Sequence, residues 1–185
     1  LQLGTLGQKF DYIIVVGVLH HMQEPMRGWK ILCDLLKPDG LMRVGLYSKI
    51  ARRSIFKARE IIKERGYPSD SEGMKKFRKE SITLLEKPAF EDIYGSPDYY
   101  FLNMYRDLLF HVNEHNHDIP EIESALKELK LRFISFFNPN ICADYSRMFP
   151  EDIARTNLQN WHLFEEKNPT SFKSMYVFWC QKEND

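Results

Sequence analysis

Apolar and polar positions in the first 50 residues predict a strand, a helix and a second strand. The run Phe10–Val18 is short, β-branched and apolar on both alternating faces, which is typical of a strand buried between two helical layers. Pro25 then suits a first helical turn. Apolar residues follow at three- and four-residue spacings: Met26, Trp29, Leu32, Cys33 and Leu36. Lys37–Gly40 predicts the end of this helix and a turn, and Leu41–Tyr47 predicts the second strand. We therefore expect a βαβ unit with parallel strands.

Residues 49–117 predict a helical insertion. Helices are expected over Ile50–Gly66 and from about Ser71 to Glu86, whereas Pro88–Tyr100 is aromatic-rich and expected to be irregular. Tyr99–His111 fits a helix or a loop, and no strand is expected between Ser48 and His117. Connections in α/β proteins are usually short, so an insertion of this length is typical of a lid or a substrate-binding element.

Regular structure is expected again from Asp118, which is a plausible N-cap with Pro120 in the first turn. A strand is predicted over Leu131–Phe137, and a mostly helical segment over Phe149–Lys167. The β-prone run Ser174–Gln181 predicts the last strand. The pattern favours one α/β domain spanning residues 1–185, with residues 49–117 inserted into it.

Composition narrows the function classes. Lys and Arg number 26 and Asp and Glu number 26, so the charges cancel and no nucleic-acid partner is expected. No apolar run approaches the roughly 18 residues of a membrane span, and the first residues do not resemble a signal peptide. The three cysteines are far apart in the sequence and form no CxxC pair, which indicates reduced thiols. We expect a cytoplasmic protein with no membrane partner.

The stretch FDYIIVVGVLHHMQEPMRGWKILCDLLKPDGLMRVGLYS resembles the second half of a class I S-adenosylmethionine-dependent methyltransferase core. The matching positions are a Phe-Asp strand start, a Leu-His-His end, a Glu-Pro helix start and a Leu-Lys-Pro-x-Gly turn: Phe10, Asp11, Gly17, Val18, Leu19, His20, His21, Glu24, Pro25, Leu36, Lys37, Pro38, Asp39 and Gly40. Arg106–Phe136 also resembles a segment that follows the core in some bacterial methyltransferases. The resemblance implies a partial Rossmann-like sheet consisting of the last four strands, with the final one antiparallel, and S-adenosylmethionine as cofactor.

This chain departs from the family pattern before Phe10. A complete family member has further strands there, and the first of them runs into a glycine-rich turn. Gly4-Thr5-Leu6-Gly7 follows no predicted strand and opens no predicted helix, which are the two contexts that such a turn requires. We expect the 185-residue chain to form about half of the cofactor pocket, and we expect cofactor binding to require an upstream glycine-loop segment.

Candidate site residues follow from the sheet. Ligands of open α/β sheets bind beyond the C-terminal ends of the strands. The end of the first strand gives the cofactor-binding candidates Gly17, Val18, Leu19 and His20. His20 or His21 could act as a general base, because imidazole titrates near neutral pH, or could line the pocket wall. Tyr47 and Ser48, at the end of the second strand, are candidate substrate contacts.

Polar residues near the end of the insertion offer further candidates. The string from His111 to His115 matches the inverted zinc motif H-x-x-E-H. Asn113, Asn116 and Asp118-Ile119-Pro120 disfavour the firm helix that this motif needs, so we expect no metal ion. A polar loop near the site is one interpretation. The other is substrate contact by a set of polar side chains: Arg106, His111, Glu114 and His115.

Two functions follow. The first is S-adenosylmethionine-dependent methyl transfer to a small-molecule or protein acceptor. The alternative is a non-catalytic interaction or dimerisation module derived from a methyltransferase fold. An open edge on the strand Phe10–Val18 would favour association with another strand, so a homo-oligomer is also expected.

Overall fold

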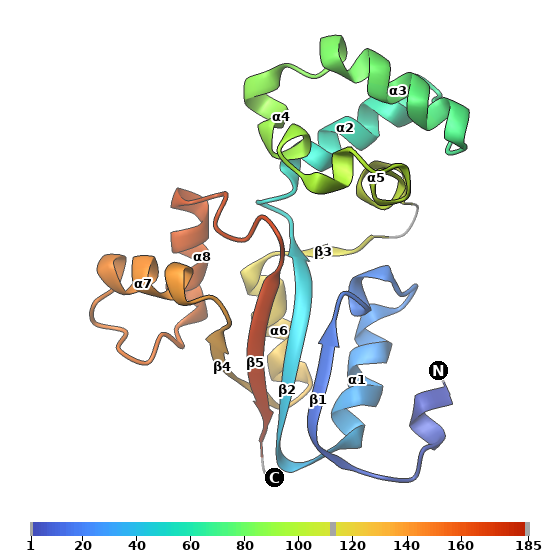
Figure 1. Cartoon of the computed structure of the whole chain (residues 1–185). Coiled ribbons are helices and arrows are strands. Elements are labelled where there is room, and N and C mark those ends of the chain that lie inside the picture. Colours follow the sequence, from blue (N-terminus) through green and yellow to red (C-terminus); the bar gives the residue numbers. More distant parts are fainter. Residues whose placement is uncertain (1, 112–113, 184–185) are drawn as a thin grey trace. The chain divides into compact units, whose positions relative to one another are not determined.

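Four strands form one mixed sheet in the computed structural model, which describes residues 2–111 and 114–183 (Figure 1). Its order is β1–β2–β5–β4, with bounds Phe10–Val16, Leu36–Ser48, Tyr176–Lys182 and Leu131–Phe136. β1 and β2 are parallel, whereas β5 is antiparallel to both of its neighbours. The predicted α/β sheet with an antiparallel last strand is therefore confirmed. A further two-residue strand, β3 (Asn116–His117), pairs with the end of β2 and was not expected from the pattern.

The turn between the first helix and β2 differs from the prediction. β2 begins at Leu36 instead of Leu41, because Leu36 already pairs with Phe10. The next pair is Tyr12 with Leu41, so the intervening residues of β2 form an irregularity in the register. Asp39 has φ 58° within it. Aspartate tolerates this left-handed conformation better than most residues, which explains how the strand passes through the turn sequence.

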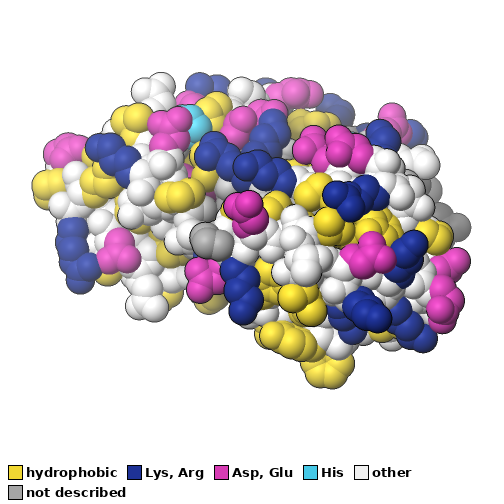
Figure 2. Space-filling model, turned by 90° about the horizontal axis from the view of Figure 1, so that it is seen from above, with side chains coloured by type: hydrophobic (Ala, Val, Ile, Leu, Met, Phe, Trp, Pro, Cys, Tyr) yellow, Lys and Arg dark blue, Asp and Glu magenta, His cyan; other side chains and the backbone are white. Residues whose placement is uncertain are grey.

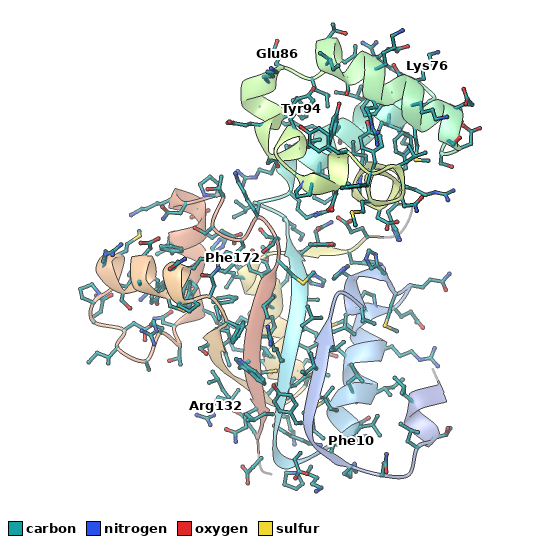
Figure 3. All side chains as sticks on the ribbon, in the orientation of Figure 1. Phe10, Lys76, Glu86, Tyr94, Arg132 and Phe172 are labelled. Carbon is teal, nitrogen blue, oxygen red and sulfur yellow. The ribbon has the colours of Figure 1, made fainter. Side chains whose placement is uncertain are left out.

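Three helices cover one face of the sheet: α1 (Pro25–Leu35), α6 (Ile119–Glu128) and α8 (Leu158–Lys167). In Figure 1, α6 lies behind β2 and β5. Alternate strand residues point into this core, and Met42, Val44 and Phe178 are fully buried there. The labelled Phe172 in Figure 3 packs on the same core. Because buried and exposed residues alternate along the strands, every second side chain contributes to the core that supports the strand ends.

The predicted helix over Phe149–Lys167 is wrong at its start. The structure has α7 over Pro139–Met148, an irregular segment, and α8 from Leu158. Asn138 and Asn157 cap the two helices by accepting hydrogen bonds from backbone N–H groups of the first turn. Asp152 organises the segment between them, since it accepts hydrogen bonds from the Tyr145 hydroxyl and from two backbone N–H groups.

The opposite face of the sheet has exposed apolar side chains. Tyr12, Ile14 and Val16 of β1 are 45%, 59% and 37% exposed. The guanidinium of Arg43 on β2 lies 3.9 Å from the ring centroid of Phe137, which is itself 54% exposed. This face thus has the composition of a surface that packs against other protein.

The chain divides into two compact units, Leu1–Ala51 with Asn113–Asp185, and Arg52–Val112. The second unit is helical, with α2 (Arg53–Glu64), α3 (Ser71–Leu84), α4 (Lys87–Tyr94) and α5 (Leu102–Leu109). Its core contains the fully buried Phe77, Ile93 and Tyr105.

The stretch from Pro88 to Tyr100, expected to be irregular, is mostly helical in this second unit. It forms most of α4 and the 3₁₀ turn Pro97–Tyr99. The Tyr94 side chain points toward the interior of the helices (Figure 3), and its hydroxyl donates to the carbonyl of Ser81 on α3 at 2.7 Å. This contact helps to fix the segment as helix.

Acidic and basic side chains are interspersed on the face shown in Figure 2, in keeping with the zero net charge of the chain. Neighbouring opposite charges form ion pairs in both units, such as Arg147 with Asp144 and Lys75 with Glu72. Among the described residues, each helix is too short or too polar to cross a lipid bilayer.

Candidate functional site

The C-terminal ends of β1 and β2 lie side by side, because the two strands are parallel and Val16 pairs with Gly45. The chain leaves β1 through Gly17, which has φ 76°. A side chain at this position would be strained by that backbone conformation, although nothing lies within 4 Å of where its Cβ would stand. Val18 is 51% exposed, whereas the next residue, Leu19, is fully buried and anchors the 3₁₀ turn Leu19–His21 in the core.

Three aromatic side chains meet at these strand ends. The imidazole of His20 is fully buried, and its centroid lies 4.1 Å from the Tyr47 ring with an interplanar angle of 42°. The His21 imidazole lies 4.3 Å from that of His20, with the edge of one ring toward the face of the other. His21 is only half-buried. The structure thus brings together His20, His21 and Tyr47, which were predicted from separate strands.

A third segment joins the two strand ends. The backbone N–H of His115 donates to the His20 carbonyl at 2.8 Å. The next two residues form β3, which pairs in parallel with Tyr47 and Ser48, and the N–H of Lys49 donates to the His117 carbonyl at 2.9 Å. His115 therefore lies beside the other candidates through its backbone, while its side chain is exposed.

Ser48 has a different environment from Tyr47. Its hydroxyl is fully buried, donates to Glu165 Oε1 at 2.5 Å and accepts the N–H of Ala51 at 3.0 Å. The other carboxylate oxygen of Glu165 accepts the Tyr176 hydroxyl. Burial raises the pKa of Glu165, and the two hydroxyl donors oppose that effect only in part. Because the Ser48 hydroxyl is committed to these bonds, it supports the end of β2.

A cavity of about 490 Å³ opens beside His117, between α1 and α6. Its lining mixes apolar and acidic side chains: Met26, His117, Asp118, Pro120, Glu121, Ser124, Ala125 and Glu128. Burial lowers the pKa of His117, and the nearby carboxylate of Glu121 opposes that shift. The imidazole at this cavity is therefore harder to protonate than a histidine in water.

The remaining candidates fall in two places. Arg106 and His111 belong to the helical unit, where the Arg106 guanidinium donates to the Ser69 carbonyl at 3.5 Å. Glu114 belongs to the unit that contains the sheet, and its Oε1 accepts a hydrogen bond from the side-chain amide of Asn116.

The H-x-x-E-H string is not placed as a zinc motif. Residues 112–113 lie outside the described residues, and His111, Glu114 and His115 lie outside helices. Within 2–111 and 114–183, no group of three or more His, Cys, Asp or Glu side chains is arranged to hold a metal ion.

Sequence reasoning did not identify Glu165, Tyr176 or the strand β3. A signal for Glu165 was present, because it follows Leu158 and Trp161 at helical spacing and therefore lies on the apolar face of α8. A carboxylate in such a position needs hydrogen-bond donors from the core. Tyr176 gave no such signal in the sequence, because tyrosine is a common residue in strands.

Comparisons with known proteins support the fold. No family model matches the chain. A Synechococcus protein named "uncharacterized protein syc1184_c" is 41% identical over 60 residues, which are 32% of this chain and 14% of that protein.

Two solved structures of PKMT2 from Rickettsia typhi resemble the whole chain. The one in complex with AdoHcy has a TM-score of 0.65 and 16% identity, and the match covers 100% of this chain and 38% of PKMT2. The other has the same TM-score and identity and covers 96% and 36%. The chain therefore has the fold of part of PKMT2, and it spans under two fifths of the similar structures.

Proposed function

We propose that this chain is the C-terminal part of a class I, bacterial-type methyltransferase domain that transfers a methyl group from S-adenosylmethionine to a small-molecule or protein acceptor. The observation behind the proposal is the meeting of His20, His21 and Tyr47 at the C-terminal ends of two parallel strands. Ligands of open α/β sheets bind at that edge. The likeness to AdoHcy-bound PKMT2 supports the same interpretation.

The residues at this edge fit one side of the cofactor. Gly17 has open space where a side chain would stand, and Val18 is exposed, so backbone and an apolar side chain can lie against a ligand. When bound, the cofactor supplies an electrophilic methyl group on a sulfonium. We propose that the glycine-rich loop for the other side belongs to an upstream segment, since the chain matches only 38% of PKMT2.

The two histidines differ in burial, and we assign them different roles. His20 is fully buried against Tyr47 and forms the pocket wall. His21 is half-buried, so its imidazole can reach an acceptor hydroxyl or amine and take its proton as a general base. Tyr47 orients the bound molecules. Positioning in a site shielded from water lowers the barrier to methyl transfer further.

Calorimetric titration of S-adenosylhomocysteine tests this function. The full-length gene product is expected to bind it, and the 185-residue chain is expected to bind far more weakly or not at all. A His20→Ala variant of the full-length product is expected to lose affinity, whereas Ile82→Ala, an exposed position on α3, is the control. Absence of binding by the full-length product would contradict the methyltransferase proposal.

A second function is supported by the exposed apolar side chains of β1. Tyr12, Ile14 and Val16 lie on a strand that pairs with β2 on one side. The free edge of such a strand can pair with a strand of another molecule. The second proposal is therefore a non-catalytic module that dimerises with another copy of this chain through β1. Sedimentation of the 185-residue chain as a monomer at all concentrations would contradict it.

A further inference from the structure

A buried carboxylate joins three elements of the sheet unit behind the strand ends. Glu165 on α8 is fully buried. Its two oxygens accept hydrogen bonds from Ser48 at the end of β2, with Oγ–Oε1 2.5 Å, and from Tyr176 at the start of β5. Because β5 is antiparallel to β2, its first residue lies beside the last residues of β2, where Tyr176 pairs with Leu46. One side chain therefore spans both strands and a helix.

The arrangement holds Ser48 in one orientation. The hydroxyl has a single hydrogen, and that hydrogen is directed to Glu165 while the oxygen accepts the N–H of Ala51. Hydrogen bonds to a charged acceptor are about twice as strong as those between neutral groups. Leaving a buried carboxylate without its donors is costly, so the geometry favours the complete set of bonds.

Ser48 is directly bonded along the chain to Tyr47, and adjacent strand residues point to opposite faces. Fixing the Ser48 side chain toward α8 therefore fixes the Tyr47 ring on the other side, against His20 at 4.1 Å. The same end of β2 pairs with β3 through Tyr47 with Asn116 and Ser48 with His117. A shift of Ser48 would move both contacts.

We propose that Glu165 is a positioning residue for the cofactor pocket: through Ser48 and Tyr176 it sets the end of β2, and thereby the packing of Tyr47 on His20. This inference rests on the proposed methyltransferase function for its consequence in binding. Glu165 itself touches neither cofactor nor acceptor, since it lies in the core on the helix-covered side. Its effect reaches the pocket only through β2.

The test uses two variants of the full-length gene product, Glu165→Gln and Tyr176→Phe, and a matched pair of controls. Tyr145 and Asp152 form a similar tyrosine–carboxylate bond at 2.5 Å in the same unit, beside α7. Tyr145→Phe and Asp152→Asn therefore remove an equivalent interaction away from β2. For each protein, S-adenosylhomocysteine affinity, thermal stability and the His20 imidazole NMR resonances are measured, with His20→Asn used to assign those resonances.

Glu165→Gln and Tyr176→Phe are expected to weaken S-adenosylhomocysteine binding about tenfold, the factor expected for one lost hydrogen bond to a charged group, and to shift the His20 resonances. The two control substitutions are expected to lower thermal stability while leaving the S-adenosylhomocysteine affinity and the His20 resonances unchanged. Unaltered affinity and His20 resonances in both test variants would overturn the inference. So would an equal loss of affinity in the controls, since that indicates general destabilisation.

The two proposals fail separately. If the unmodified protein does not bind S-adenosylhomocysteine, the proposed function is wrong. The His20 resonances of Tyr176→Phe then still decide the structural inference: a shift supports the connection from Glu165 to His20, and no shift overturns it. Tyr176→Phe removes only a hydroxyl group, so it keeps the test valid where Glu165→Gln does not fold.

Discussion

The imidazole of His20 packs on the ring of Tyr47 with 4.1 Å between centroids, although His20 lies in the turn after β1 and Tyr47 lies near the end of β2. The parallel pairing of β1 and β2 brings them together, because the end of β2 and the turn that follows β1 lie at the same edge of the sheet. Buried aromatic pairs of this kind add about 0.5–1.5 kcal/mol beyond the area that they bury. The contact therefore ties the segment after β1 to the end of β2.

A double-mutant cycle on His20→Leu and Tyr47→Leu tests this contact. The coupling free energy, from urea unfolding of the two single variants and the double variant, is expected to be about 0.5–1.5 kcal/mol. A matched cycle on Tyr67 and Phe77, whose rings lie 5.0 Å apart in the helical unit, gives the reference value. Additive losses for His20 and Tyr47 would show that the two strand ends are independent.

Glu165 predicts a pH dependence of stability with a definite sign. Its pKa is raised in the folded protein above the ordinary 4.5, because burial outweighs the hydrogen bonds from Ser48 and Tyr176. Between the two pKa values the folded state binds more protons than the unfolded state. The resulting contribution to stability is present below pH 4.5 and is lost as pH rises through the folded pKa.

We therefore expect the unfolding free energy of the protein, minus that of Glu165→Gln, to decrease as the pH rises from 4.5 through the folded pKa of Glu165. The other groups that act on Glu165 are His162 and Asp118, and they are present in both proteins. Urea unfolding at each pH gives the difference. A difference that rises with pH would show that the pKa is lowered.

Asp118 is expected to stabilise α6 through its cap. Its carboxylate accepts the N–H of Glu121 at 2.9 Å, and the Glu121 side chain accepts the N–H of Asp118 in return. Asp118→Ala is expected to lower the free energy of unfolding by about 1 kcal/mol. Ser124→Ala, which removes an exposed hydroxyl from the same helix, is expected to change it by less than about 0.5 kcal/mol. Equal effects of the two substitutions would exclude a capping role.

Ile14 tests the association proposed for β1. It is 59% exposed on this strand, and a lysine at such a position discourages strand addition. In sedimentation velocity, the 185-residue chain is expected to show a sedimentation coefficient that rises with concentration, and Ile14→Lys is expected to abolish that rise. Ile82→Lys, which changes a 65% exposed isoleucine on α3, is the control. The same concentration dependence in Ile14→Lys would place the association elsewhere.

The sequence predicted the four strands of the main sheet well because each of them has a distinct apolar run. The run from Phe10 and the final run to Gln181 became β1 and β5, which begin or end within a few residues of the prediction. The helix α7 was missed because its buried face is short, with Tyr145 as its fully buried residue. Its Asn138-Pro139 start is a capping signal that apolar spacing alone overlooks.

The candidate site was predictable only in part. His20, His21 and Tyr47 could be found because they lie at or just after the ends of predicted strands, and the C-terminal ends of parallel strands meet at one edge of the sheet. Glu165 comes from a helix 117 residues after Ser48 along the chain, and its hydrogen bond depends on tertiary packing. Polar residues that act within the core are visible in sequence only as exceptions to the apolar pattern.

Backbone NMR titration of the full-length gene product with S-adenosylhomocysteine tests the central claim most directly. The amide resonances of Gly17–His21 and Tyr47–Ser48 are expected to shift as the ligand is added, because these strand ends form one side of the pocket. The amides of α7 are expected to remain unchanged. Binding that leaves the strand-end resonances unmoved, or shifts only those of α7, would contradict the account.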